Sequence, residues 1–82
     1  MAFHHVCGII VESGEYATYP YIIIQTPPPD FHRVTIYIQI LNASDRVRCS
    51  LNSYIELLVW VTPDPNGAND TIEAREILYL SS

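Results

Sequence analysis

Apolar and polar side chains alternate along two segments of this chain, and a half-buried β-strand produces this period-two pattern. In residues 32–41 the aliphatic side carries Val34, Ile36, Ile38 and Ile40, opposite Arg33, Thr35, Tyr37 and Gln39. In residues 54–62 the aliphatic side carries Ile55, Leu57, Val59 and Val61, opposite Tyr54, Glu56, Leu58 and Trp60. We predict a strand over each segment, with the aliphatic side facing the core.

Two further segments are rich in Val, Ile and Tyr, which suit a pleated surface. Residues 4–12 contain Gly8, and a glycine inside a strand marks a bulge or a sharp bend at a barrel corner. We expect residues 13–15 (Ser-Gly-Glu) to form the turn that follows. Residues 19–26 run into three consecutive prolines, which cannot donate to a strand ladder and therefore end this strand.

The rest of the chain consists of loops between the strands and of a final segment that could form either a helix or a strand. Residues 42–53 are polar and irregular, long enough for a short helix or a crossing loop, and Asn66-Gly67 predicts a tight turn. In residues 71–80 an opening capping-box pattern favours a helix, whereas the closing Ile-Leu-Tyr-Leu favours a strand. We predict a strand, because the four strands before it need a partner to close an edge.

Five strands with an irregular insert between the third and the fourth resemble the layout of the OB-fold. The chain resembles the OB-folds of single-stranded DNA-binding proteins in particular. The resemblance rests on the glycine-interrupted residues 6–10, on residues 33–38, on the step from residues 50–51 into 54–57, and on the closing residues 72–77. It implies an all-β, small five-stranded OB-like barrel in which residues 1–82 form a single domain.

Charge restricts the partners of such a domain. The 82 residues include nine acidic side chains, four Arg and no Lys, which gives a net charge of −5. This charge opposes non-specific attraction to a polyanion or to an anionic membrane surface. Nucleic acid would therefore be held by stacking and a few placed Arg side chains. If all four Arg contacted phosphates, the salt slope would be only about −3, at roughly 0.7 per contact on a single strand.

The candidate site lies on the outer side of the predicted barrel. With the aliphatic side chains facing inward, Tyr21, Tyr37 and Trp60 face outward, and an OB-fold holds oligonucleotides on its second and third strands. A base stacked on an aromatic ring contributes about 1–3 kcal/mol. We expect single-stranded nucleic acid to be bound by stacking rings and phosphate-contacting arginines: Tyr21, Arg33, Tyr37, Arg46, Arg48 and Trp60.

A second function class fits the same residues. Outward Ile23, Leu58 and Trp60 would form an apolar patch that a solitary domain rarely leaves in water. Together with the acidic balance, this patch indicates a protein-interaction or oligomerisation subunit with no nucleic-acid contact of its own. A homo-oligomer or another protein would then be the partner, and both alternatives remain open at this point.

Catalysis, cofactors and metals are not indicated. No nucleophile-elbow or phosphate-cradling glycine motif occurs. His4 and His5 are adjacent, so on a strand they point to opposite faces, and His32 is far along the chain. Cys7 and Cys49 are too few for a disulfide scaffold or a structural zinc site, and we expect two buried thiols. We predict a non-catalytic binding domain without a cofactor.

No membrane or export signal is recognised in the sequence. The apolar run 55–61 is interrupted by Glu56 and is far shorter than the roughly 20 residues of a membrane span. Residues 1–5 contain no Lys or Arg, unlike the start of a signal peptide. We therefore expect an intracellular protein, in the cytoplasm, without a membrane partner.

Overall fold

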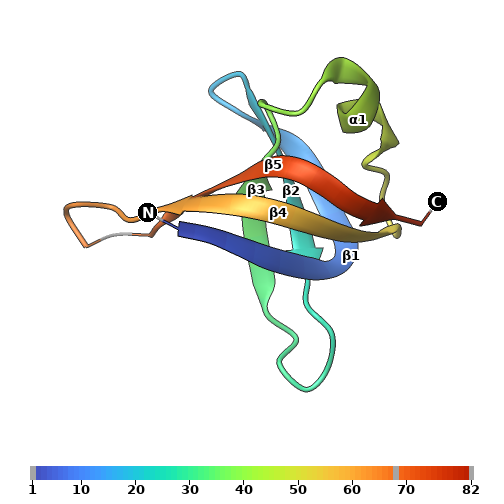
Figure 1. Cartoon of the computed structure of the whole chain (residues 1–82), viewed down its shortest axis with the longest axis horizontal. Helices are drawn as coiled ribbons and strands as arrows, with labels where there is room; N and C mark the ends of the chain where they lie inside the picture. The colour runs from blue at the N-terminus through green and yellow to red at the C-terminus, as the bar shows by residue number, and fades with distance from the viewer. Residues whose placement is uncertain (1, 68, 82) are drawn as a thin grey trace.

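Strands make up most of the chain (Figure 1), which is described here by a computed structural model covering residues 2–67 and 69–81. Five strands and one short helix follow in the order β1 (Ala2–Tyr16), β2 (Tyr19–Gln25), β3 (Arg33–Tyr37), α1 (Ala43–Arg48), β4 (Tyr54–Thr62) and β5 (Thr71–Leu80). Residues 71–80 are a strand, which confirms the prediction, and residues 42–53 contain the short helix. No helix among these residues is long and apolar enough to cross a membrane.

The five strands close into a barrel in the order β1-β2-β3-β5-β4. All neighbours are antiparallel except β3 and β5, whose parallel pairing joins Tyr37 to Glu73. β1 is long enough to pair with β4 along its first half and with β2 along its second half. Figure 1 shows this strand curving around the sheet. Closure gives each strand two neighbours, which removes the exposed edges of an open sheet.

The core consists of the inward positions of every strand. The buried side chains of β2, β3 and β4 follow the predicted alternation. Among the described residues, the fully buried ones are Ile10, Ile22, Ile24, Ile36, Ile55, Leu57, Val59 and Ala74. Leu41 and Cys49, which flank α1, join the same cluster, although α1 itself contributes no buried residue. The Asn42 side chain caps α1 by accepting a hydrogen bond from the Asp45 N–H at 2.9 Å.

Gly8 lies where β1 passes from one neighbour to the other. It pairs with Ile55 of β4, and the next residue, Ile9, pairs with both Tyr54 and Gln25. A Cβ at this position would overlap the backbone carbonyl of Gln25, so only glycine lets the two strands approach. Gly8 thus marks the place where β1 changes neighbours, and the register shift of this strand follows between Ile10 and Glu12.

The turn predicted at residues 13–15 is wrong. β1 continues through Gly14 to Tyr16, and the chain reverses at Ala17 and Thr18, whose φ angles are +50° and +70°. Positive φ at both central residues is the geometry of a type I′ hairpin turn, which Asn-Gly usually signals. Neither Ala nor Thr carries that signal, so the sequence pointed to the nearest glycine instead.

The alternation predicted for residues 32–41 breaks after Ile38. β3 ends at Tyr37, and the backbone then turns, with the Leu41 N–H donating to the Ile38 carbonyl at 3.2 Å. As a result Leu41 is buried, whereas Ile40, which was predicted to face the core, is 45% exposed. The aliphatic side of this segment therefore ends one residue pair earlier than predicted.

Candidate nucleic-acid interface

Four tyrosines gather on the outer side of the first three strands. Tyr16 and Tyr19 pair across the β1–β2 hairpin, and Tyr21 and Tyr37 pair across β2 and β3. Side chains two residues apart on a strand share a face, so Tyr19 and Tyr21 point the same way. We call these four residues the tyrosine face. Tyr16 and Tyr19 are 69% and 49% exposed, so their rings are open to a ligand.

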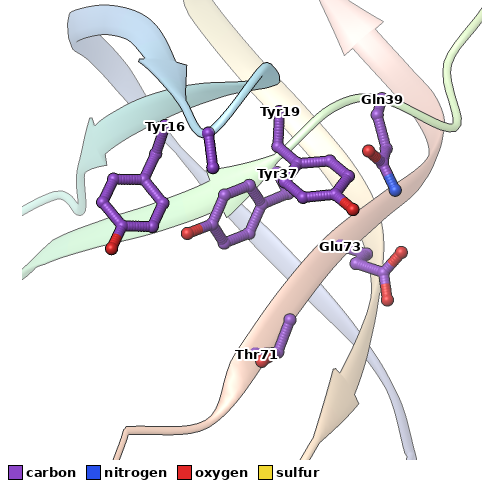
Figure 2. Close-up of a pocket in the computed structure, with 7 residues that line it drawn as sticks. Tyr16, Tyr19, Tyr37, Gln39, Thr71 and Glu73 are labelled. Atoms are coloured by element: carbon purple, nitrogen blue, oxygen red, sulfur yellow. The ribbon is translucent and has the colours of Figure 1, made fainter.

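Three of these rings line one open groove of about 340 Å³. Figure 2 shows Tyr19 and Tyr37 in the middle of the view, Tyr16 on one side, and Gln39 and Glu73 on the other. The full lining is Tyr16, Ala17, Tyr19, Tyr37, Gln39, Thr71 and Glu73. We call this the tyrosine groove. Its volume is at the lower end of the range of small-ligand pockets, and its three phenol rings offer stacking surfaces.

Tyr21, the fourth tyrosine, lies beside the groove and supports it. Its ring meets the Tyr37 ring edge to face, with centroids 6.4 Å apart and an interplanar angle of 72°. Tyr21 instead lines a second cavity of about 370 Å³, together with Arg46, Val47 and Cys49 from the α1 region and residues of the β1–β2 hairpin. The structure therefore brings Tyr21 close to both Tyr37 and Arg46, two other predicted site residues.

Trp60 belongs to a different aromatic group. Its ring packs against Phe3 with centroids 4.5 Å apart, and the Arg75 guanidinium lies 5.7 Å from the ring centroid, within cation–π range. We call Phe3, Trp60 and Arg75 the tryptophan group. Trp60 lies on β4, and Glu73 of β5 pairs with it on one side and with Tyr37 of β3 on the other. One strand thus separates Trp60 from the tyrosine face.

The predicted arginines lie at different places around the barrel. Arg33 is exposed at the start of β3, where it pairs with Gln25 at the end remote from the β1–β2 hairpin. The Arg46 guanidinium donates to the carbonyls of Leu41 at 2.6 Å and Gln39 at 3.2 Å, which fixes the turn after β3. Arg48 forms an exposed ion pair with Asp45 at 3.4 Å.

Several residues of the tyrosine groove were not among the site residues predicted from the sequence. Tyr16 directly follows the predicted turn at residues 13–15, and Tyr19, although expected to face outward, was not included. Glu73 was ambiguous because its segment could have been helical. Alternation carried on from the buried Ile10 would place Tyr16 on the core side, but the register of β1 shifts between Ile10 and Glu12 and turns Tyr16 outward, which no local pattern signals.

Two side chains away from the tyrosine groove have shifted pKa values. Burial raises the pKa of the Cys49 thiol, the Asp45 carboxylate adds to the rise, and Arg48 opposes it. The pKa of the Tyr54 phenol is raised to about 12, first by a hydrogen bond with Cys7. Both cysteines are free thiols. Among residues 2–67 and 69–81, no three His, Cys, Asp or Glu side chains are grouped to hold a metal ion.

Comparison with known proteins relates the barrel to a solved structure. No protein-family model and no curated protein matches the chain. The mitochondrial single-stranded DNA-binding protein Rim1 of S. cerevisiae matches over 98% of this chain and 92% of its own, with a TM-score of 0.55 and 14% identity. At this identity the likeness concerns the fold alone. With its closed order β1-β2-β3-β5-β4 and its helix between β3 and β4, the domain is an OB-fold, as the layout predicted.

Proposed function

We propose that this domain binds single-stranded nucleic acid on its tyrosine face and catalyses no reaction there. The observation that carries the proposal is the convergence of Tyr16, Tyr19 and Tyr37 on one open groove. The rings come from β1, β2 and β3, and the second and third strands are those with which OB-folds bind oligonucleotides. The likeness to a single-stranded DNA-binding protein supports the same ligand.

The charges of the domain determine how strongly such binding would depend on salt and how much of the affinity would come from stacking. Arg46, Arg48 and Arg75 are engaged with backbone carbonyls, Asp45 and the Trp60 ring, respectively. For Arg33 the described residues provide no hydrogen-bond or ion-pair partner, so this exposed side chain is free to contact a phosphate, although it lies at the end of β3 remote from the β1–β2 hairpin. One phosphate contact gives a salt slope of roughly −0.7 on a single strand. Stacking on three rings, at about 1–3 kcal/mol each, would then supply most of the affinity.

A fluorescence anisotropy titration with a labelled single strand tests this proposal. We expect Tyr19→Ala and Tyr37→Ala each to weaken binding by about 5- to 150-fold, the equivalent of one lost stack of about 1–3 kcal/mol. Tyr79→Ala is the matched control, because Tyr79 is 54% exposed on β5 and outside the groove. The control should bind as the wild type does. Absence of binding at low salt by the folded wild-type domain would refute the proposal.

A second candidate function, contact with another copy of this chain, is favoured by the outer side of β1, β4 and β5. This side has several exposed apolar residues beside the half-buried Leu58 and Trp60: Phe3, Ile9, Leu78 and Tyr79. It also carries both signs of charge, since Arg75 is next to Glu76 in the sequence. On the same side, the His5 ring is hydrogen-bonded to the Glu56 carboxylate at 3.1 Å. A two-fold contact is self-complementary, so the arginine of each copy can meet a carboxylate of the other.

Sedimentation velocity of the purified domain tests the second candidate. We expect concentration-dependent association that Leu58→Glu abolishes and Val47→Glu leaves intact, because Val47 is 79% exposed on α1 and away from this face. Ile23, which was predicted to share an apolar patch with Leu58 and Trp60, lies on β2 and is not part of the outer side of β1, β4 and β5. A protein that sediments as a monomer at all concentrations would refute contact between two copies of this chain. Trp60, the chain's one tryptophan, lies on this face, so association of two copies would shift its emission to shorter wavelength.

A further inference from the structure

The tyrosine groove contains a carboxylate, and its lining contains no basic side chain. Besides Ala17 and the three rings, the residues that line it are Gln39, Thr71 and Glu73. Glu73 pairs in register with Tyr37, so both side chains emerge on the outer side of the barrel at the same level. Figure 2 shows its carboxylate on the same side of the view as the Gln39 amide.

Nothing among the described residues neutralises this carboxylate. Glu73 forms no ion pair or side-chain hydrogen bond within residues 2–67 and 69–81, and it is only half buried, so it remains available to a ligand. The nearest arginine along β5, Arg75, lies over the Trp60 ring. A phosphate placed in the groove would be repelled by the negative charge. The groove therefore suits a base, and the sugar–phosphate backbone has to pass outside it.

We infer that the tyrosine groove selects guanine, with Glu73 as the residue that determines the specificity; this inference rests on the proposed function. An ionised carboxylate only accepts hydrogen bonds. The Watson–Crick edge of guanine presents two adjacent donors, N1–H and the 2-amino group, which match the two carboxylate oxygens. Cytosine and adenine present one amino group beside an acceptor nitrogen. Thymine and uracil present a single N–H between two carbonyls, which the carboxylate repels.

Gln39 and the rings complete the recognition of this base. The Gln39 amide carries NH₂ donors, and guanine O6 is an acceptor next to N1–H. Tyr19 and Tyr37 supply stacking surfaces that are indifferent to the base, so discrimination falls to Glu73 and Gln39. Bases of single strands are read in this manner, by stacking plus hydrogen bonds to the Watson–Crick edge.

The test compares oligonucleotides of about 15 nucleotides, near the upper site size of one OB-fold. Oligothymidylate is titrated against the same strand with isolated guanosines, with isolated cytidines, and with inosine in place of guanosine. We expect guanosine to raise the affinity about tenfold, as one good bidentate contact does. Inosine lacks the 2-amino group and should lose most of this gain.

Two variants distinguish an effect of the Glu73 carboxylate itself from an effect of the net charge of the domain. Glu73→Gln should abolish the preference for guanosine and strengthen the binding of oligothymidylate, because a negative charge is removed from the groove. Glu76→Gln removes the same charge from the exposed side of β5 outside the groove, and it should keep the preference.

Three results would overturn the inference. Equal binding of all the strands by the wild type would refute guanine selection and leave the proposed nucleic-acid binding intact. Loss of the preference in Glu76→Gln as well would assign it to net charge. Tyrosines around a carboxylate also suit a quaternary ammonium group, so Glu73-dependent binding of a trimethyl-lysine peptide with no binding of any strand would overturn both this inference and the proposed function.

Discussion

The Tyr21 phenol lies across Gly14 of the neighbouring strand, where a Cβ would stand 2.9 Å from the Tyr21 hydroxyl oxygen. The two residues are register partners, and Tyr21 meets Tyr37 on its other side. An aromatic ring that covers a glycine on the adjacent strand is a recognised way of stabilising a curved sheet. Gly14 thus determines how the Tyr21 ring lies and how it supports the tyrosine groove.

Gly14→Ala should change the position of a ring rather than the stability of the barrel. The atoms in the way are the far end of a flexible side chain, so we expect a change within about 0.5 kcal/mol, typical of a tolerated surface substitution. For a chain of this size that is a melting shift of about 2–4 °C. The Tyr21 and Tyr37 ring resonances should nevertheless move in NMR spectra. Unmoved resonances would show that the ring does not cover Gly14.

Gly8→Ala is the contrasting substitution in the same strand. A Cβ there meets the Gln25 backbone, which cannot swing aside. We expect the free energy of unfolding to fall by about 1–3 kcal/mol, the cost of forced overpacking. Chemical denaturation of the two variants side by side measures the difference. Equal stability of both variants would contradict the barrel corner at Gly8.

Thr18→Gly should stabilise the β1–β2 hairpin. Thr18 has a φ of +70°, a region that costs a side-chain-bearing residue about 1–2 kcal/mol. Glycine removes this strain and adds an entropy cost of roughly 0.5–1 kcal/mol. The net gain in unfolding free energy should be up to about 1.5 kcal/mol, measured by denaturation. A destabilised Thr18→Gly variant would indicate that the chain does not reverse at this residue.

Ile36 and Ile40 belong to one alternating stretch of sequence but differ in burial. Ile36 is fully buried, whereas Ile40 is 45% exposed after the turn that follows β3. Ile36→Ala should therefore lower the free energy of unfolding by about 2–5 kcal/mol. Ile40→Ala should change it by less than about 0.5 kcal/mol. Equally large losses would place Ile40 back in the core.

Cys49 should react with a thiol reagent more slowly than Cys7. The Cys49 side chain is buried and its pKa is raised, so less thiolate is present at neutral pH, and thiolate is the reactive form. Because folding favours the neutral thiol, its contribution to stability is complete below the unfolded pKa and is lost as the pH rises through the folded value. Cys7→Ser and Cys49→Ser each leave one thiol to measure. Equal rates in the folded proteins would contradict the burial of Cys49, whereas equal rates in denaturant are expected.

Strands were predictable wherever one side was aliphatic. β4 has the predicted bounds, because Ile55, Leu57 and Val59 alternate without interruption between a polar insert and a proline. The hairpin at Ala17 was not predictable, because its strained φ angles depend on the register of the long strands on both sides. The exposure of Ile40 likewise depends on a hydrogen-bonded turn that alternation alone does not reveal.

The candidate site was predictable by face but not by position around the barrel. Alternation places Tyr21, Tyr37 and Trp60 on the outer side, yet it does not say which strands are neighbours. β5 enters between β3 and β4, so Trp60 is separated from the tyrosine face and meets Phe3 instead. Glu73 enters the groove through the parallel β3–β5 pairing, a long-range contact that no local pattern signals.

The most direct measurement is photochemical cross-linking of a single strand containing 5-iododeoxyuridine, followed by mass mapping of the modified peptides. The proposed function predicts cross-links to Tyr16, Tyr19 or Tyr37, all of which line the tyrosine groove. Cross-links confined to Phe3, Trp60 or Tyr79, which lie outside the tyrosine groove, would contradict it.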